Sequence, residues 1–260
     1  MRVCVLGHRG MLGHRVARYL KDMGHEILTI TQKYQPEHDH EFTESVLATQ
    51  PDWCINCIGV GPHAGIDPGL MFAVNAELPA TLVKNLPASI RFIQASTDGV
   101  FKPDQPNRIA SDIPDASDDY GVSKQRAETA VLAAQRHVIR CSIIGTELAT
   151  SRNLLSWFLS QNECVQGYTN QSWNGVTTLE WAKCCDRVMK EPGRIGAKLL
   201  QPGFMPACSK FELLGSIAQV WKHDIRIDSG VSRFPVARTL VPNFPSPPLV
   251  QQLTELHEYR

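Results

Sequence analysis

The sequence predicts an α/β fold, a doubly wound parallel sheet with helices on both faces and a small C-terminal lobe. Three observations lead to this prediction. Short apolar runs alternate with helical stretches through the first half of the chain, which is typical of parallel β-α-β units. A glycine-rich turn, residues 7–13, joins the first apolar run to the first helical stretch. Tyr120 and Lys124 stand four positions apart, as on one face of a helix.

The first half contains the expected elements of the sheet in regular order. The apolar runs expected to be strands are 3–6, 26–31, 53–58, 91–95 and 138–144. The stretches expected to be helices are 11–23, 44–49, 70–85 and 124–134. Because strands and helices alternate, we expect the strands to be parallel and to be covered by helices on both sides.

The second half is less regular. Helices are expected at 153–160, 179–189 and 211–221, and one further strand at 198–201. Segment 235–248 is rich in proline, so we expect it to run over the surface. Ligands of doubly wound folds bind at the carboxyl ends of the strands. We expect the second half to cover that edge.

Composition and charge exclude several classes of function. The chain has 260 residues, with 26 lysines and arginines and 26 aspartates and glutamates. A net charge of zero gives no electrostatic reason to expect binding to nucleic acid or to a membrane surface. No apolar run is long enough to span a bilayer, and the first residues do not resemble a secretory leader. We therefore expect no membrane insertion and a cytoplasmic location.

The eight cysteines are expected to be small buried residues rather than metal ligands or disulfides. Cys54 and Cys57 form a CxxC pair inside an apolar run, where positions three apart point to opposite faces of a strand. One metal ion or one disulfide is therefore hard to build from them. The histidines show no spacing typical of metal ligands, so no metal site is expected.

The turn over residues 7–13, GHRGMLG, has the pattern GxxGxxG and lies between a strand and a helix. Glycines allow a sharp turn and a close approach of the backbone to a pyrophosphate. The helix N-terminus adds free N–H groups and a partial positive charge. The turn therefore predicts a dinucleotide site of the Rossmann type, and a purely structural turn is the alternative.

The choice of dinucleotide depends on the end of the second expected strand. An acidic residue at that point holds the ribose hydroxyls of NAD, but residues 29–33, TITQK, contain no acid. Arg9 in the glycine turn and Lys33 after the strand are suited to a 2′-phosphate. NADPH is therefore the expected cofactor and NAD(H) the alternative, while solvated surface charges would be the other explanation of Arg9 and Lys33.

Tyr120 and Lys124 suit acid–base chemistry on a carbonyl or alcohol group. A free tyrosine has a pKa of about 10, and a nearby positive charge lowers that value. We therefore expect Lys124 to lower the pKa of Tyr120 and to make it a general acid. Spacing alone is weak evidence, because such pairs also occur by chance on surface helices.

Three motifs together resemble the extended short-chain dehydrogenase/reductase family. They are the GxxGxxG turn, the segment 94–101, QASTDGVF, and Tyr120-xxx-Lys124. Within the family, STDGVF is similar to the STDxVF of the dTDP-4-dehydrorhamnose reductase branch. The glycine turn is also similar to that of GDP-fucose synthases, which are NADPH-dependent. Residues 56–59 and Asn75 fit the family's cofactor-contacting strand and the helix after it. The resemblance covers residues 1–145 well and the remainder loosely.

The resemblance implies a role for each matching position. Tyr120 would deliver a proton to the substrate oxygen, Lys124 would also hold the nicotinamide ribose, and Thr97 would donate a hydrogen bond to the same oxygen. The expected cofactor contacts besides Tyr120 and Lys124 are Gly7, Arg9, Gly10, Met11, Leu12, Gly13, Lys33, Cys57, Ile58, Gly59 and Asn75. The expected substrate contacts are Asp98, Gly99, Arg140, Asn153, Trp173 and Arg238. For Asp98 a turn-capping role, and for Arg140 a structural role, remain alternatives.

The resemblance also implies a division of the chain and a class of partner. Residues 1–145 would form an NADP-binding Rossmann domain, completed by parts of 176–206. Residues 146–175 and 207–260 would form a small substrate-binding lobe. The expected partner is a nucleotide-sugar substrate, and because relatives are commonly dimers, a homodimer is also considered.

Two departures from the family narrow the expected reaction. Gly99 replaces the tyrosine usual in the branch, so the sugar pocket is expected to differ in size or shape. Dehydratases carry an Asp-Glu pair where this chain has Asp98-Gly99, and epimerases usually carry an acid after the second strand. We therefore expect an NADPH-dependent reductase of a nucleotide-activated 4-keto sugar, serving cell-surface polysaccharide or glycoconjugate synthesis. An epimerase and a non-catalytic NADP-binding regulatory subunit are the alternatives.

Overall fold

The computed structural model describes residues 1–62, 65–191 and 196–259. Its centre is a six-stranded sheet in the order β10-β5-β4-β3-β1-β2, in which all the paired strands are parallel. The strands are β1 (Arg2–Leu6), β2 (Glu26–Leu28), β3 (Trp53–Asn56), β4 (Arg91–Ser96), β5 (His137–Arg140) and β10 (Leu199–Leu200). The expected strand positions are confirmed, although β2 ends at Leu28 and the run 138–144 is divided between β5 and β6 (Ile143–Ile144).

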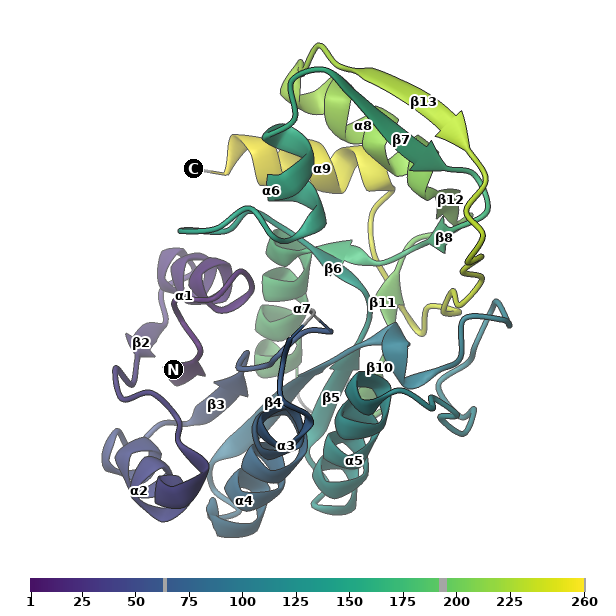
Figure 1. Cartoon of the computed structure of the whole chain (residues 1–260). Coiled ribbons are helices and arrows are strands. Elements are labelled where there is room, and N and C mark those ends of the chain that lie inside the picture. Colours follow the sequence, from purple (N-terminus) through teal and green to yellow (C-terminus); the bar gives the residue numbers. More distant parts are fainter. Residues whose placement is uncertain (63–64, 192–195, 260) are drawn as a thin grey trace.

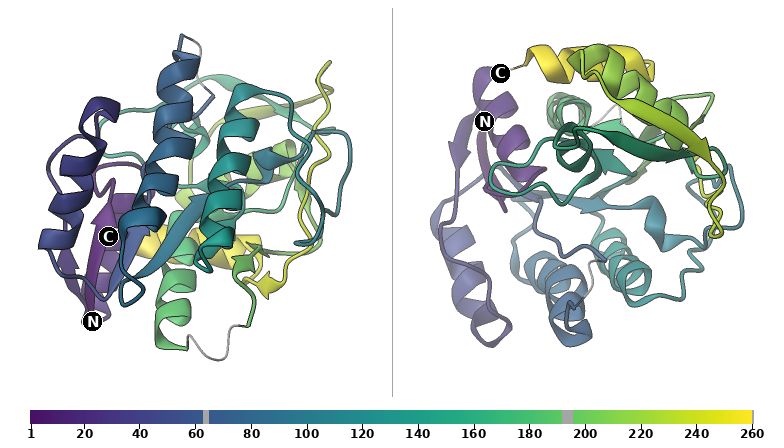
Figure 2. Two further views of the ribbon diagram at one scale, coloured as in Figure 1. Left: turned by 90° about the horizontal axis from the view of Figure 1, so that it is seen from below. Right: turned by 45° about the horizontal axis from the view of Figure 1, so that its top comes forward.

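Helices cover both faces of this sheet (Figure 1; Figure 2). Helices α1 (Gly13–Asp22) and α7 (Thr178–Lys190) pack on one face. Helices α2 (Asp39–Ala48), α4 (Leu78–Asn85) and α5 (Asp119–Ala133) pack on the other. Alternate residues of β1 supply the two cores, because successive side chains of a strand point to opposite faces. The expected α/β class is confirmed.

Two helices differ from expectation in ways that affect the site. The expected helix 70–85 begins as α3 (Pro68–Phe72), passes through a π-helical segment, Ala73–Glu77, and continues as α4. Such π segments are frequent at functional sites. Helix α5 begins earlier than expected, because the Asp118 side chain caps it by accepting a hydrogen bond from the N–H of Gly121 at 2.9 Å. Tyr120 therefore lies in its first turn.

A smaller group of elements lies over the carboxyl edge of the sheet (Figure 1). It contains α6 (Leu154–Leu159), α8 (Lys210–Trp221) and α9 (Leu249–Glu258), which share one apolar core. Its strands are short and paired over long distances in the sequence. The pairs are β7 (Cys164–Tyr168) with β13 (Arg226–Gly230), β8 (Ser172–Trp173) with β12 (Cys208–Ser209), β6 with β9 (Val176–Thr177), and β11 (Pro202–Gly203) with β14 (Phe244–Pro245).

Segment 235–248 was expected to run over the surface, and this is wrong for part of it. Thr239 and Leu240 are buried, and Leu240 packs with Val100 and Phe101. The N–H of Arg108 donates to the carbonyl of Thr239 at 2.9 Å. This segment therefore ties the smaller group to the sheet.

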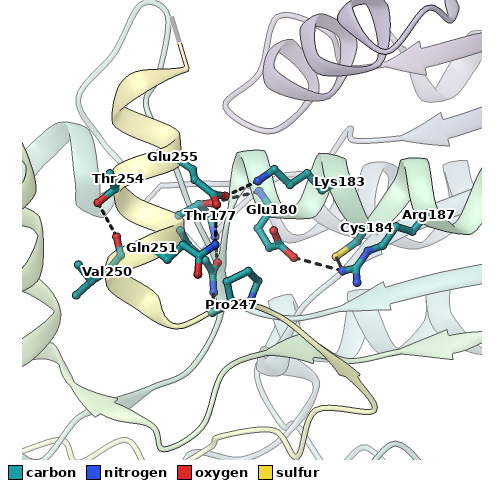
Figure 3. Close-up of polar contacts among 11 residues, drawn as sticks. Thr177, Glu180, Lys183, Cys184, Arg187, Pro247, Val250, Gln251, Thr254 and Glu255 are labelled. Carbon is teal, nitrogen blue, oxygen red and sulfur yellow. Dashed lines mark hydrogen bonds and ion pairs between the residues drawn. The ribbon is translucent and has the colours of Figure 1, made fainter.

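Helix α9, which was not expected from the sequence, docks on α7 through polar contacts (Figure 3). Lys183 of α7 forms an ion pair with Glu255 of α9. The Gln252 side chain accepts a hydrogen bond from the N–H of Thr177 at 3.1 Å. Within α7 itself, the buried Glu180 pairs with Arg187 at 3.3 Å.

Among the helices of the described ranges, none is long and apolar enough to cross a bilayer.

Candidate active site

Two neighbouring cavities open at the carboxyl ends of the strands. The first, which we call the β2 cavity, measures about 510 Å³ and is lined by residues of 6–9, 30–34 and 58–60, together with Phe42, Leu70 and Val74. The second, the β4 cavity, measures about 370 Å³ and is lined by residues of 10–12, 57–62, 95–97 and 141–143, with Asn75, Tyr120, Lys124 and Asn153. Ile58, Gly59 and Val60 line both cavities.

The glycine turn borders both cavities, and its glycines are required by close backbone contacts. Gly7 has φ of +75°, where a side chain would be strained. A Cβ on Gly13 would lie 2.2 Å from the carbonyl oxygen of Gly7, which no larger residue can tolerate. No side chain caps the start of α1, and its first turn contains no acidic residue. This N-terminus therefore suits a pyrophosphate, as the sequence predicted.

The β2 cavity carries two cationic side chains in its lining. Arg9 and Lys33, which are distant in the sequence, both line it. None of the described residues that line it is acidic. The pKa of His8, next to Arg9, is lowered by partial burial and by the arginine charge. The cavity therefore suits an anionic group near Arg9 and Lys33.

Thr97 and Tyr120 both line the β4 cavity, and the residue against which both pack is Gly99, which has no side chain. Thr97 follows β4, and its hydroxyl accepts a hydrogen bond from the N–H of Gly99 at 3.0 Å and donates to Asp98 at 3.1 Å. A Cβ on Gly99 would lie 3.2 Å from both Thr97 Oγ1 and Tyr120 Cε1. Gly99 thus allows the phenol ring to approach the threonine.

Lys124 lies deep in the same cavity. The residue is only 5% exposed, and its Nζ donates a hydrogen bond to the carbonyl of Ala95 at 2.7 Å. Burial lowers the pKa of Lys124 to about 8. The ammonium group therefore fixes α5 to β4 while remaining at the wall of the cavity.

The expected effect of Lys124 on Tyr120 is wrong. Burial raises the pKa of Tyr120 above its ordinary value, and the hydrogen bond with Thr97 offsets this only in part. Asp98 raises the pKa of Tyr120 further, while Arg238 lowers it. The phenol is therefore protonated at neutral pH, which suits a proton donor.

Asn75 contributes to the site by holding the strip shared by the two cavities. Its side chain accepts from the N–H of Val60 and donates to the carbonyl of Val60, both at 2.9 Å. It also donates to the hydroxyl of Ser123 at 3.2 Å. Residues 57–59 line the β4 cavity beside it, so this part of the predicted cofactor set is brought together.

Two buried amides, which lie in the motifs 56–59 and 94–101 but were given no role of their own, support this arrangement. Asn56 donates to Gln94 at 3.0 Å and accepts from the N–H of Ile58 at 3.1 Å. Gln94 donates to the Ala95 carbonyl at 2.9 Å, the same oxygen that Lys124 contacts. The sequence did indicate such a role, because each amide lies in an apolar run expected to be a buried strand, and buried amide groups are seldom without a hydrogen-bond partner.

The predicted substrate contacts divide into two groups. Asn153 lines the β4 cavity, and Arg238 lies 3.6 Å from the Asp98 carboxylate beside Thr97. Lys210, at the start of α8, was missed: its pKa is lowered by burial, partly opposed by Asp98. Lys210 begins α8 and Arg238 lies in the segment after β13, so no motif in the sequence indicates that the two side chains lie near the same carboxylate.

Arg140 and Trp173 are buried among partners of their own, and for Arg140 this fits the structural role given as the alternative. Arg140 is 2% exposed, and it donates to the Glu128 carboxylate through Nε at 2.8 Å and Nη2 at 2.5 Å. Trp173 is buried against Phe204, and its indole N–H donates to Ser142 at 2.8 Å. Neither lines the described cavities, because each is held in a core by its own partners.

The family assignment rests on a match over more than half of the chain. A model of the NAD dependent epimerase/dehydratase family matches residues 3–150. The chain belongs to this family. The expected membership of the extended short-chain dehydrogenases/reductases, and with it the class of NAD(P)-dependent oxidoreductases, is confirmed at the level of the family. A search of curated proteins finds no match.

Solved structures of several other proteins share the fold over nearly the whole chain. A dTDP-4-dehydrorhamnose reductase from Clostridium acetobutylicum has a TM-score of 0.82 at 18% identity, with 100% of this chain and 99% of that chain covered. The dTDP-4-dehydrorhamnose reductase from Bacillus anthracis, in complex with NADP, has a TM-score of 0.86 at 16% identity, with 98% of each covered. RMD from Pseudomonas aeruginosa, complexed with NADPH, has a TM-score of 0.76 at 16% identity, with 98% and 95% covered. At these identities the likeness establishes the fold.

Proposed function

We propose that the protein reduces a nucleotide-activated 4-keto sugar with NADPH. The observation that carries the proposal is that Thr97, Tyr120 and Lys124 line one cavity, which adjoins a second cavity with two cations and no acid among its described residues. NADPH would supply the hydride when bound. The dTDP-4-dehydrorhamnose reductases that share this fold support this choice of reaction.

Each residue of the set has a role that its surroundings support. Tyr120, protonated because burial raises its pKa, would give its proton to the carbonyl oxygen as negative charge develops there. Thr97 would hydrogen-bond the same oxygen, after releasing Asp98. Lys124 would hold the ribose hydroxyls at the wall of the β4 cavity. The glycine turn would hold the pyrophosphate, with Met11 and Leu12 against the nicotinamide side.

The two cationic side chains that line the β2 cavity support a preference for NADPH over NADH. Arg9 and Lys33 would pair with the 2′-phosphate, and an acid that would repel it is absent from the described lining. Structures of the same fold contain NADP, NADPH and, in a dTDP-glucose 4,6-dehydratase, NAD, so the support for NADPH comes from the charge of the cavity. NAD(H) stays the alternative cofactor.

The substrate would enter from the side of the smaller lobe. Arg238 and Lys210 bring two positive charges toward the single carboxylate of Asp98. The excess of positive charge suits the diphosphate of a nucleotide sugar. Gly99 and Asn153 would border the sugar, and residues 146–175 and 207–260 would form the substrate-binding lobe over the cofactor domain.

The proposal is tested with the purified chain, NADPH and a panel of dTDP-, UDP- and GDP-linked 4-keto sugars. We expect loss of NADPH absorbance with at least one of them and reduction at C4 in the product. Binding of NADPH without turnover of any panel member would contradict the proposal and favour a regulatory subunit. A product epimerised without net NADPH loss would favour an epimerase.

A further inference from the structure

A buried ion pair lies behind the face of α5 that carries Lys124. Glu128 and Arg140 are each 2% exposed, and they are joined by the two hydrogen bonds at 2.8 and 2.5 Å. Replacing a buried ion pair by apolar residues is often neutral or stabilising. The pair is therefore poorly explained by stability alone, and its position suggests another role.

Glu128 stands one helical turn beyond Lys124, on the same buried face of α5. Burial disfavours the ammonium form of Lys124, and the Ala95 carbonyl gives it only one hydrogen bond. The groups that oppose this effect are Glu128, on the same helix, and Cys57, at the end of β3. Burial raises the pKa of the Cys57 thiol well above neutral pH, and that of Tyr120 is raised as well, so both are uncharged. Glu128 is the carboxylate that acts on Lys124.

We propose that Glu128 is a positioning residue, whose buried carboxylate keeps Lys124 in its ammonium form. Arg140 holds the carboxylate in place with its forked contact. Because Arg140 binds the carboxylate group and both residues are buried, the negative charge of Glu128 stays beside α5 and does not turn toward solvent.

The same network reaches the lobe. Arg140 donates through Nη1 to the side chain of Gln201 at 3.0 Å. Gln201 in turn donates to the carbonyls of Arg108 and Val241, both at 3.1 Å. Val241 belongs to the segment that carries Arg238. This chain of hydrogen bonds therefore joins Glu128 to the segment that carries Arg238.

The sign of the pH effect follows from the direction of the shift. The pKa of Lys124 is about 8 in the folded protein and about 10.5 in the unfolded chain, as for free lysine. The folded protein then binds fewer protons between these values, so its stability rises as the pH rises from about 8 to about 10.5. Removing the Glu128 charge lowers the folded value further, so the rise begins at a lower pH.

The test compares unfolding midpoints in urea from pH 6 to pH 10 for the full chain. Wild type, Lys124→Met, Glu128→Gln and the double variant Glu128→Gln/Lys124→Met form a cycle that isolates the contribution of Lys124. We expect its onset to fall by about one to two pH units when Glu128 is neutral. An onset that does not move would overturn the proposal.

Two further variants guard against a trivial outcome. Glu180→Gln removes another buried acid that is paired with an arginine, on α7 and outside both cavities, and should leave the onset unchanged. An equal shift in this control contradicts the proposal. If Glu128→Gln does not fold, Glu128→Gln/Arg140→Met leaves no unpaired charge, and a smaller shift in the same direction is expected.

A kinetic readout rests on the proposed reductase function. With a sugar that is turned over, the alkaline limb of kcat/KM should move to lower pH in Glu128→Gln and stay in Glu180→Gln. A purely structural role would lower stability without moving that limb. Because the urea cycle needs no substrate, failure to find a sugar leaves the inference on Glu128 testable by itself.

Discussion

The β2 cavity and the β4 cavity lie side by side at one edge of the sheet, but they are built in different ways. Among the residues that the structure describes, the β2 cavity is lined only by residues between Leu6 and Val74. The β4 cavity draws residues from Gly10 to Asn153, including the ends of three strands and the first turns of α5. The first is thus local in sequence, and the second depends on the packing of the whole sheet.

This difference separates the proposed recognition of the 2′-phosphate from the chemistry. Charges that would select the cofactor stand on the turn after β1 and the loop after β2. Groups that would move a proton stand after β4 and on α5. Of the described lining residues, only Ile58, Gly59 and Val60 belong to both cavities, so a change that leaves this strip in place should affect one cavity and spare the other.

The largest effect is expected for Tyr120→Phe, which changes only the β4 cavity. Removing the hydroxyl that donates the proton should lower kcat about 10³-fold. NADPH affinity, measured by fluorescence titration, should stay within about twofold, because no atom of the β2 cavity changes. Tyr19→Phe, a partly buried tyrosine that packs on Tyr259, is the control. Retained turnover in Tyr120→Phe would refute the proposed acid.

Asn75→Ala should disturb both cavities at once. It removes three hydrogen bonds and leaves the N–H of Val60 without its partner, which should lower the free energy of unfolding by about 2–4 kcal/mol. Both NADPH affinity and kcat should fall. Asn85→Ala, in which an exposed side chain loses one bond to Thr81, should stay within about 0.5 kcal/mol. A variant that loses only one of the two properties would show that the strip is not shared.

Arg9→Gln and Lys33→Gln should alter only the β2 cavity. Each should raise the Kd for NADPH about tenfold, since a phosphate partner is lost, and should leave the Kd for NADH unchanged. Calorimetric titration with both cofactors measures this. Lys84→Gln, an exposed lysine at the end of α4, is the matched control. Equal weakening of NADH would argue against a 2′-phosphate contact.

The smallest effect is expected far from both cavities. Gly215 is an exposed glycine inside α8, and a Cβ there meets no atom within 4 Å. Gly215→Ala should stabilise the protein by about 0.5–1 kcal/mol, because alanine favours the helix. Urea unfolding measures the gain, and NADPH affinity should not change. A lower free energy of unfolding in Gly215→Ala would contradict this expectation and show that α8 does not tolerate a methyl group at this exposed position.

The sheet and most of the site could be predicted from the sequence, because both depend on local patterns. Continuous apolar runs marked the buried strands, and the carboxyl ends of parallel strands meet at one edge, which brings Thr97 to Tyr120 and Lys124. The raised pKa of Tyr120 could not be predicted, since it depends on how deeply the ring is buried.

The substrate side was predicted less well for a related reason. Arg140 ends a strand, as a ligand-binding residue could, but its direction is set by Glu128 on a different element. Lys210 approaches Asp98 only because α8 starts beside the two-residue pair of β8 and β12. Pairs this short carry no periodicity that a sequence could reveal.

The pairing of β7 with β13 has a consequence for how the protein folds. Cys164 of β7 pairs with Arg226 of β13, so this ribbon closes only after a long intervening segment has been ordered. Contacts between distant residues slow folding, because the entropy of a long loop is lost before the contact is gained. The β2 cavity needs no such closure. During refolding, dinucleotide affinity should therefore return before turnover, and the last part to become native would be the lobe.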